Sequence, residues 1–130
     1  MGLEFIKTHK APEAIGPYSQ GTVGEKNSKV LLVSGQLPVK DGELKTEIKE
    51  ATLTSLENVL AIVEAGGGKL EDIARVGVFV KDMDDFSEIN KVYEEFFKDH
   101  KPARALVEVS KLPKDAVIEI EATALITQNL

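Results

Sequence analysis

Two amphipathic segments are the only helices that this sequence predicts, and they must cover every strand that it predicts. Residues 46–68 carry apolar side chains at helical spacing, with Thr46 as the expected N-cap and the glycines from Gly66 as the stop. Residues 84–99 repeat the pattern and place Phe86, Asn90, Tyr93 and Phe97 on one stripe. A chain with so few helices can cover only a small sheet.

Four segments rich in apolar and β-branched residues predict the strands of that sheet: 29–36, 73–81, 104–110 and 116–126. The order of strand, helix, strand, helix, strand, strand favours an α+β or mixed α/β layer built as a single domain over residues 1–130. Both crossovers should have the same hand, so both helices are expected on one face of the sheet.

The other face of the sheet then has no helix to cover it. Residues 30–33 and 76–80 nevertheless look apolar on both faces, and 29–36 is typical of a strand buried on both sides. The uncovered face must therefore be buried against another copy, which predicts a homo-oligomer packed sheet to sheet.

Composition excludes several classes of protein. The chain has no cysteine, which rules out a disulfide scaffold, a thiol nucleophile and a cysteine-ligated metal. It also has no apolar run of about 18 residues and no signal-peptide core in its first residues, so we expect no membrane partner and a cytoplasmic location. The net charge of −6 and the lack of a basic stripe with interleaved aromatics argue against a nucleic-acid partner. His9 and His100 share no ligand spacing, so no metal site is expected.

Residues 101–122 place one arginine in a strand that precedes a Glu-x-Glu strand. Of the 16 basic residues only Arg75 and Arg104 are arginines. Arginine binds a carboxylate through two parallel hydrogen bonds and keeps its charge when water is removed, whereas lysine is a point charge. Arg104 is therefore a candidate for recognising a planar anion, while Arg75, with no motif around it, is expected to be a surface residue.

The two glutamates that follow permit two interpretations. Glu119 and Glu121 alternate along a strand and so share one face. Alternation alone favours a solvated face. If that face is buried in an oligomer, the carboxylates need a cation or a water channel.

Three further positions also leave alternatives open. Tyr18 follows a Gly-Pro turn and is typical of a half-buried rim aromatic. Ser34-Gly35 ends a strand and indicates either a bulge or backbone amides approached by a ligand. Asn90 lies on an apolar stripe, where an unsatisfied amide costs about 1–3 kcal/mol, so it either caps a neighbouring loop or points into a pocket.

Four segments together resemble the RidA (YjgF-type) family of reactive-intermediate deaminases, from about Ala11 to Ala124. They are APEAIGPYSQ (11–20), VSGQLPV (33–39), VFVKDMDDFSEINKVYEEFF (78–97) and KPARALVEVSKLPKDAVIEIEA (101–122). The resemblance implies a chorismate-mutase-like α+β fold. It also implies a homotrimer with sheets inside, helices outside, and sites in clefts between neighbouring subunits.

The resemblance also implies an activity. Family members hydrolyse enamine and imine intermediates such as 2-aminoacrylate, released by PLP-dependent dehydratases, to 2-keto acids and ammonia without a cofactor. Matching positions make Arg104 and Glu119 the catalytic residues. The implied substrate-binding residues are Tyr18, Ser34, Gly35, Asn90, Arg104 and Leu106.

Two positions depart from the family pattern, and two other functions remain alternatives. Many members have cysteine at the position of Leu106 and phenylalanine at the position of Lys101, and both changes bear on pocket size and substrate preference.

A trimer that binds keto acids as a regulatory module, without turnover, would use the same residues. Translation inhibition or ribonuclease activity, attributed to some family members, is disfavoured by the negative charge.

Overall fold

A mixed sheet of four strands forms the centre of the computed structural model, which describes residues 2–128. The strand order is β3-β8-β6-β7. The strands are β3 (Lys29–Gln36), β6 (Ile73–Val80), β7 (Ala103–Glu108) and β8 (Ile118–Ile126). β8 runs antiparallel to both of its neighbours, whereas β6 and β7 are parallel. A parallel pair needs a crossover, and α2 (Phe86–Phe97) supplies it.

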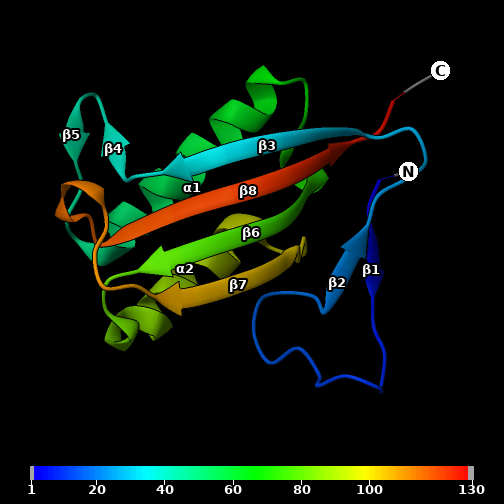
Figure 1. Ribbon diagram of the computed structural model, residues 1–130, viewed down its shortest axis with the longest axis horizontal. Coiled ribbons are helices and arrows are strands. Elements are labelled where there is room, and N and C mark those ends of the chain that lie inside the picture. The colour runs from blue at the N-terminus through cyan, green and yellow to red at the C-terminus, as the bar shows by residue number, and fades with distance from the viewer. Residues whose placement is uncertain (1, 129–130) are drawn as a thin grey trace.

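Both helices lie on the same face of this sheet, as predicted (Figure 1). α1 (Ile48–Ala65) and α2 pack their apolar stripes on the strand residues that point toward them. The core contains fully or nearly fully buried side chains from both layers, including Leu56, Val59, Val76, Val78, Ile89, Tyr93, Ile118 and Ile120. Within residues 2–128, neither helix combines the length and the apolar character needed to span a bilayer.

Short elements complete the fold, and the two pairs of short strands among them were not predicted from the sequence. β1 (Glu4–Ile6) and β2 (Gly21–Val23) form an antiparallel ribbon, and the hydroxyl of Thr22 ties it to β6 by donating to the Ala74 carbonyl at 2.7 Å. β4 (Val39–Lys40) and β5 (Glu43–Leu44) form a hairpin whose turn residues, Asp41 and Gly42, both have positive φ. Positive φ at both central residues is the conformation of the two-residue hairpin turns whose twist matches that of the flanking strands. Three short 3-10 turns cover Leu70–Asp72, Met83–Asp85 and Pro113–Asp115.

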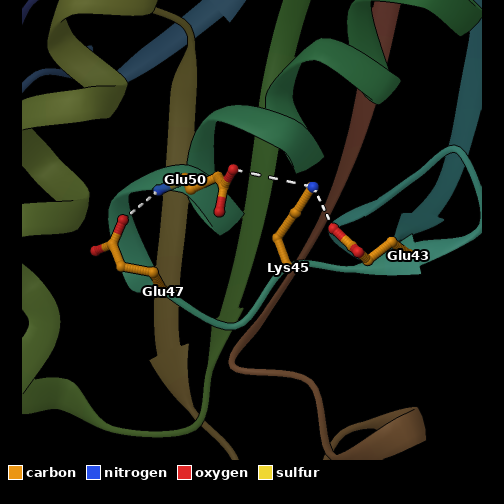
Figure 2. Close-up of polar contacts among 4 residues, drawn as sticks. All are labelled: Glu43, Lys45, Glu47 and Glu50. Carbon is orange, nitrogen blue, oxygen red and sulfur yellow. Dashed lines mark hydrogen bonds and ion pairs between the residues drawn. The ribbon is translucent and has the colours of Figure 1, made fainter.

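The predicted N-cap of the first helix was wrong. α1 begins at Ile48, and the cap is Glu47 rather than Thr46 (Figure 2). The carboxylate of Glu47 accepts hydrogen bonds from the backbone N–H groups of Lys49 at 2.9 Å and Glu50 at 3.0 Å. One side chain thus satisfies two of the backbone N–H groups that have no partner within the helix. Its negative charge also interacts favourably with the positive end of the helix dipole. The predicted stop is confirmed, since Gly66 is the C-cap.

We expect the Glu47 cap to make the stability of the fold depend on pH in the acidic range. The hydrogen bonds from the Lys49 and Glu50 backbones lower the pKa of Glu47. A carboxyl whose folded pKa is depressed stabilises the fold above its unfolded pKa, and this contribution disappears as the pH falls through the folded value. Glu47→Ala should therefore lower the melting temperature by a few degrees at pH 7, and the difference should shrink below a pH of about 4. Thermal unfolding followed by circular dichroism across this range measures it.

Glu57→Ala is the matched control, because Glu57 is an exposed glutamate in the middle of the same helix. Its effect on the melting temperature should be small at both ends of the pH range. A Glu47→Ala deficit that stayed constant down to pH 3 would contradict a contribution from the ionised cap.

The face of the sheet away from the helices is exposed in the single chain. The prediction that 29–36 is buried on both sides was therefore wrong for one copy, because Val30 is 63% exposed and Leu32 is 76% exposed while Val33 is buried. Arg75 also lies on this face, as a half-exposed residue whose Nη1 is 3.6 Å from Oε2 of Glu121. Exposed apolar side chains are what packing between sheets requires, and the oligomer itself stays a prediction.

Candidate functional site

The side chain of Arg104 lies on the helix side of β7, at the open edge of the sheet. Arg104 pairs with Val76 of β6, which is fully buried beneath the helices, and residues paired across a sheet share a face. Its Nη1 donates a hydrogen bond to Oδ1 of Asn90 on α2 at 2.7 Å. This contact satisfies the amide oxygen of Asn90, so the side chain on the apolar stripe has a cation as its partner rather than a loop.

Two aromatic rings flank the Arg104 guanidinium. Its central carbon is 4.8 Å from the ring centroid of Tyr93 and 5.4 Å from that of Tyr18. Burial lowers the pKa of Arg104, and the two tyrosines oppose that shift. Because the usual arginine pKa lies far above neutral, the group remains a cation that has lost part of its water.

The turn that brings Tyr18 to Arg104 is held by Gln20. The Gln20 amide donates to the carbonyls of Pro12 at 2.7 Å and Thr8 at 3.1 Å and accepts from the Thr8 N–H at 2.7 Å. Next to it, an isolated parallel bridge joins Ser19 to Ala103, the residue before Arg104. These contacts fix the segment between β1 and β2 against the start of β7.

A cavity of about 250 Å³ opens beside the guanidinium. Its lining consists of Ile15, Gly16, Tyr18, Phe86, Arg104 and Leu106. A Cβ on Gly16 would lie 3.2 Å from Cε2 of Tyr18 and 3.7 Å from Nη2 of Arg104, so the glycine lets the turn approach closely. An apolar cavity with one partly desolvated cation suits a small organic anion that carries a short apolar group.

A larger cavity of about 710 Å³ lies away from Arg104, and its lining includes Gly67, Lys69, Asp72 and His100. Two of its polar side chains already have backbone partners. The Asp72 carboxylate accepts from the Lys69 N–H at 2.9 Å, and Nε2 of His100 is 2.7 Å from the Ile73 carbonyl oxygen. No cluster of three histidine, aspartate or glutamate side chains that could hold a metal occurs in residues 2–128. The smaller cavity at Arg104 is therefore the stronger candidate.

Glu119 lies on the opposite face of the sheet. It pairs with Phe79 of β6, whose neighbours Val78 and Val80 point into the core. The β3–β8 register shifts between Val33 and Gln36, and a Cβ on Gly35 would stand 2.2 Å from Oε2 of Glu119. The glycine thus marks both a bulge and a close approach, and the Glu119 carboxyl lies against it beside the exposed Ser34.

One chain therefore divides the predicted site residues into two groups. Tyr18, Asn90, Arg104 and Leu106 gather on the helix side, and Ser34, Gly35 and Glu119 gather on the far face. Tyr93 was not predicted as a site residue. Its position three residues after Asn90, on the same helical face, is the signal that could have found it.

The fold is that of an α+β protein with two helices on one face of a mixed sheet. The family model described as Endoribonuclease L-PSP matches residues 8–126, and the chain belongs to this family, which is the RidA (YjgF) family that the sequence segments resemble.

Close relatives extend over nearly the whole chain. A RutC family protein of Pyrococcus horikoshii is 51% identical over 124 residues, covering 93% of this chain and 96% of the relative. The 2-iminobutanoate/2-iminopropanoate deaminase of Escherichia coli K12 is 49% identical over 125 residues, covering 92% and 95%. The crystal structure of Escherichia coli TdcF with bound serine has a TM-score of 0.74 and 44% identity, covering 95% of this chain and 99% of that one.

Proposed function

We propose that this protein hydrolyses small 2-imino acids and their enamine tautomers, such as 2-iminobutanoate and 2-iminopropanoate, to 2-keto acids and ammonia. The observation that carries the proposal is the Arg104 guanidinium in its small apolar cavity, braced by Asn90 at 2.7 Å and without an ion-pair partner within residues 2–128. The name of the relative that is 49% identical supports the same chemistry.

The cavity fits the two ends of such a substrate. The planar carboxylate would accept hydrogen bonds from the guanidinium, which offers several donors in a fixed plane. Ile15, Phe86 and Leu106 would surround a methyl or ethyl group. The substrates would be the unstable intermediates that PLP-dependent serine and threonine dehydratases release.

The proposed site needs two copies of the chain. Arg104 and Glu119 lie on opposite faces of one sheet, so a cleft that holds both must take each from a different subunit. A homotrimer with its sheets inside and its sites between neighbouring subunits meets this condition. The exposed Val30, Leu32 and Val107 support burial of the outer face in such an assembly.

In the proposed mechanism, Arg104 holds the substrate carboxylate while the enamine tautomerises to the imine. Glu119 of the neighbouring subunit holds and polarises a water molecule, aided by the backbone at Ser34 and Gly35. The water oxygen bonds to the C=N carbon, the nitrogen gains protons, and the resulting carbinolamine expels ammonia to leave the keto group. General acid–base assistance of this kind is worth about 10²- to 10⁴-fold, and no cofactor is needed.

A coupled assay tests the proposal. Threonine dehydratase and threonine generate the imine, and the appearance of 2-ketobutyrate is timed with and without this protein; serine in place of threonine compares the smaller imine. We expect the protein to shorten the lag before keto acid appears. An unchanged time course at protein concentrations equal to the dehydratase would refute the activity.

A second candidate is a module that binds small carboxylates without turnover, and the serine bound to TdcF favours it. Calorimetric titration with 2-ketobutyrate separates the two functions. Binding without any acceleration of imine hydrolysis supports the binding module, whereas binding together with acceleration supports the enzyme.

Gly35→Ala is expected to reduce imine hydrolysis by at least about tenfold while costing only about 1 kcal/mol of unfolding free energy. The new Cβ would lie 2.2 Å from Oε2 and 2.8 Å from Cδ of Glu119, so the whole carboxyl group must move, and it can swing toward solvent. The coupled assay and urea unfolding measure the two effects.

Gly42→Ala is the control for Gly35→Ala. A Cβ there meets nothing within 4 Å, and the positive φ of 77° gives a backbone cost of its own. This variant should lose stability but keep its rate. Full activity in Gly35→Ala would contradict a role for the Glu119 carboxyl in its present place.

A further inference from the structure

Tyr93 lies directly against the Arg104 guanidinium and is the most deeply buried of the groups around it. Its side chain is 0% exposed, and its ring centroid is 4.8 Å from the guanidinium carbon. It also packs on the ring of Phe97, with centroids 4.7 Å apart. Tyr93 and Asn90 are one turn apart on α2, so a single helical face supplies two contacts to one cation.

The hydroxyl of Tyr93 does not explain why a tyrosine ring is placed here. Its oxygen is buried and has no hydrogen-bond partner within residues 2–128, which is a cost to the fold. Burial also raises its pKa, so the group stays a neutral phenol. The part of Tyr93 that interacts with Arg104 is therefore the face of its ring, through a cation–π contact that becomes stronger when water is excluded.

Asn90 and Tyr93 restrict different motions of the Arg104 guanidinium. The hydrogen bond to Asn90 fixes one corner of the guanidinium, at Nη1, but leaves the group free to pivot about that bond. A ring face against the guanidinium restricts the pivot. Nη2, which lies toward Gly16 in the cavity wall, is then presented to the cavity in a fixed direction.

We propose that Tyr93 is a positioning residue that acts through its ring, holding the plane of the Arg104 guanidinium so that its unpaired donors face the cavity. The inference rests on the proposed function, because a fixed plane matters for a planar carboxylate and matters little for a point charge.

Three variants test the role of the ring. Tyr93→Phe keeps the ring and removes the unpartnered hydroxyl, so the Kd for 2-ketobutyrate and the KM for imine should stay within about twofold of the parent values. Tyr93→Leu removes the ring face and should weaken both by about tenfold, with a smaller change in kcat. Phe97→Leu is the matched control: it removes a neighbouring buried ring from the same helix, should cost comparable stability, and should leave Kd and KM unchanged.

Two outcomes of these measurements would overturn the inference. If Tyr93→Phe binds as weakly as Tyr93→Leu, the hydroxyl rather than the ring matters. If Phe97→Leu weakens binding as much as Tyr93→Leu, the effect is general loss of packing. Should Tyr93→Leu fail to fold, Tyr93→Met fills the same space without a ring face and takes its place in the comparison.

An NMR measurement decides the point without any ligand. The sequence has only two arginines, so the side-chain protons of Arg104 are readily distinguished from those of the half-exposed Arg75. The ring-current shift of the Arg104 protons should persist in Tyr93→Phe and fall to the smaller contribution of Tyr18 in Tyr93→Leu or Tyr93→Met, while the Arg75 signals stay in place. Arg104 signals that do not move in the ring-less variants would overturn the inference. A wild-type protein that neither binds nor hydrolyses the small acids would instead refute the proposed function, with the NMR result on Tyr93 still standing.

Discussion

Arg104→Ala is expected to lower kcat/KM for imine hydrolysis by about a hundred- to a thousandfold. Removing one partner of a desolvated, hydrogen-bonded charge pair costs about 2–5 kcal/mol, because the substrate carboxylate then enters the cavity without a counter-ion. The same change leaves Asn90 without its partner at 2.7 Å, so unfolding must be measured alongside the rate. The coupled dehydratase assay and calorimetric titration with 2-ketobutyrate provide the two readouts.

Arg104→Lys separates charge from geometry. A lysine keeps the positive charge but cannot bond Asn90 and present a second, coplanar donor pair to a carboxylate. We expect its kcat/KM to fall between those of the parent and the alanine variant. Lys91→Ala, which removes a cation from the exposed side of the same helix as Asn90, should leave the rate unchanged and controls for net charge. An Arg104→Ala protein with full activity would exclude the carboxylate clamp.

Glu119→Gln is expected to lower kcat by about 10²- to 10⁴-fold while 2-ketobutyrate still binds, since the amide fills the same space but is a poor base. Glu121→Gln is the matched control. Glu121 lies on the same strand and face, two residues further on, but its carboxylate is 3.6 Å from Nη1 of Arg75. Its loss should leave kcat nearly unchanged. Equal losses in the two variants would show that the face needs negative charge in general rather than Glu119 in particular.

Mixing inactive chains gives the most direct test of a site shared by two subunits. Arg104→Ala and Glu119→Gln chains, denatured and refolded together in equal amounts, should recover about a quarter of the parental activity, because random assortment pairs an intact Arg104 with an intact Glu119 in that share of clefts. Each variant refolded alone is the control and should stay inactive. No recovery in the mixture, with assembly intact, would place both residues in a cleft formed by one chain.

The sequence was most informative where structure is set locally. Apolar periodicity placed α1 and α2 within a few residues, and β-branched segments located the four main strands. The choice of arginine over lysine singled out position 104, because the chemistry of the guanidinium is a property of the residue itself. Glu47 was missed as N-cap because the preference for threonine at that position is a statistical tendency, and the carboxylate of the next residue accepts from the N–H groups of Lys49 and Glu50 instead.

The parts of the site that depend on pairing between distant strands could not be predicted. Arg104 and Glu119 occupy opposite faces because of the registers that set Arg104 against Val76 and Glu119 against Phe79, and no local pattern determines those registers. Tyr93 was not predicted as a site residue for a related reason. An aromatic on an apolar stripe looks the same whether it packs on other core residues or lies against a cation from another element.

The separation of Arg104 from Glu119 on the two faces of one sheet has a consequence for mixed populations of chains. In the proposed homotrimer, where each copy lends its arginine to one neighbour and its glutamate to the other, a chain that lacks both side chains but still assembles would disable two of the three clefts. Such a subunit would be dominant over its normal partners. In that proposed assembly, dilution far enough to dissociate the subunits would likewise abolish activity without unfolding a single chain, so specific activity should fall as the protein is diluted.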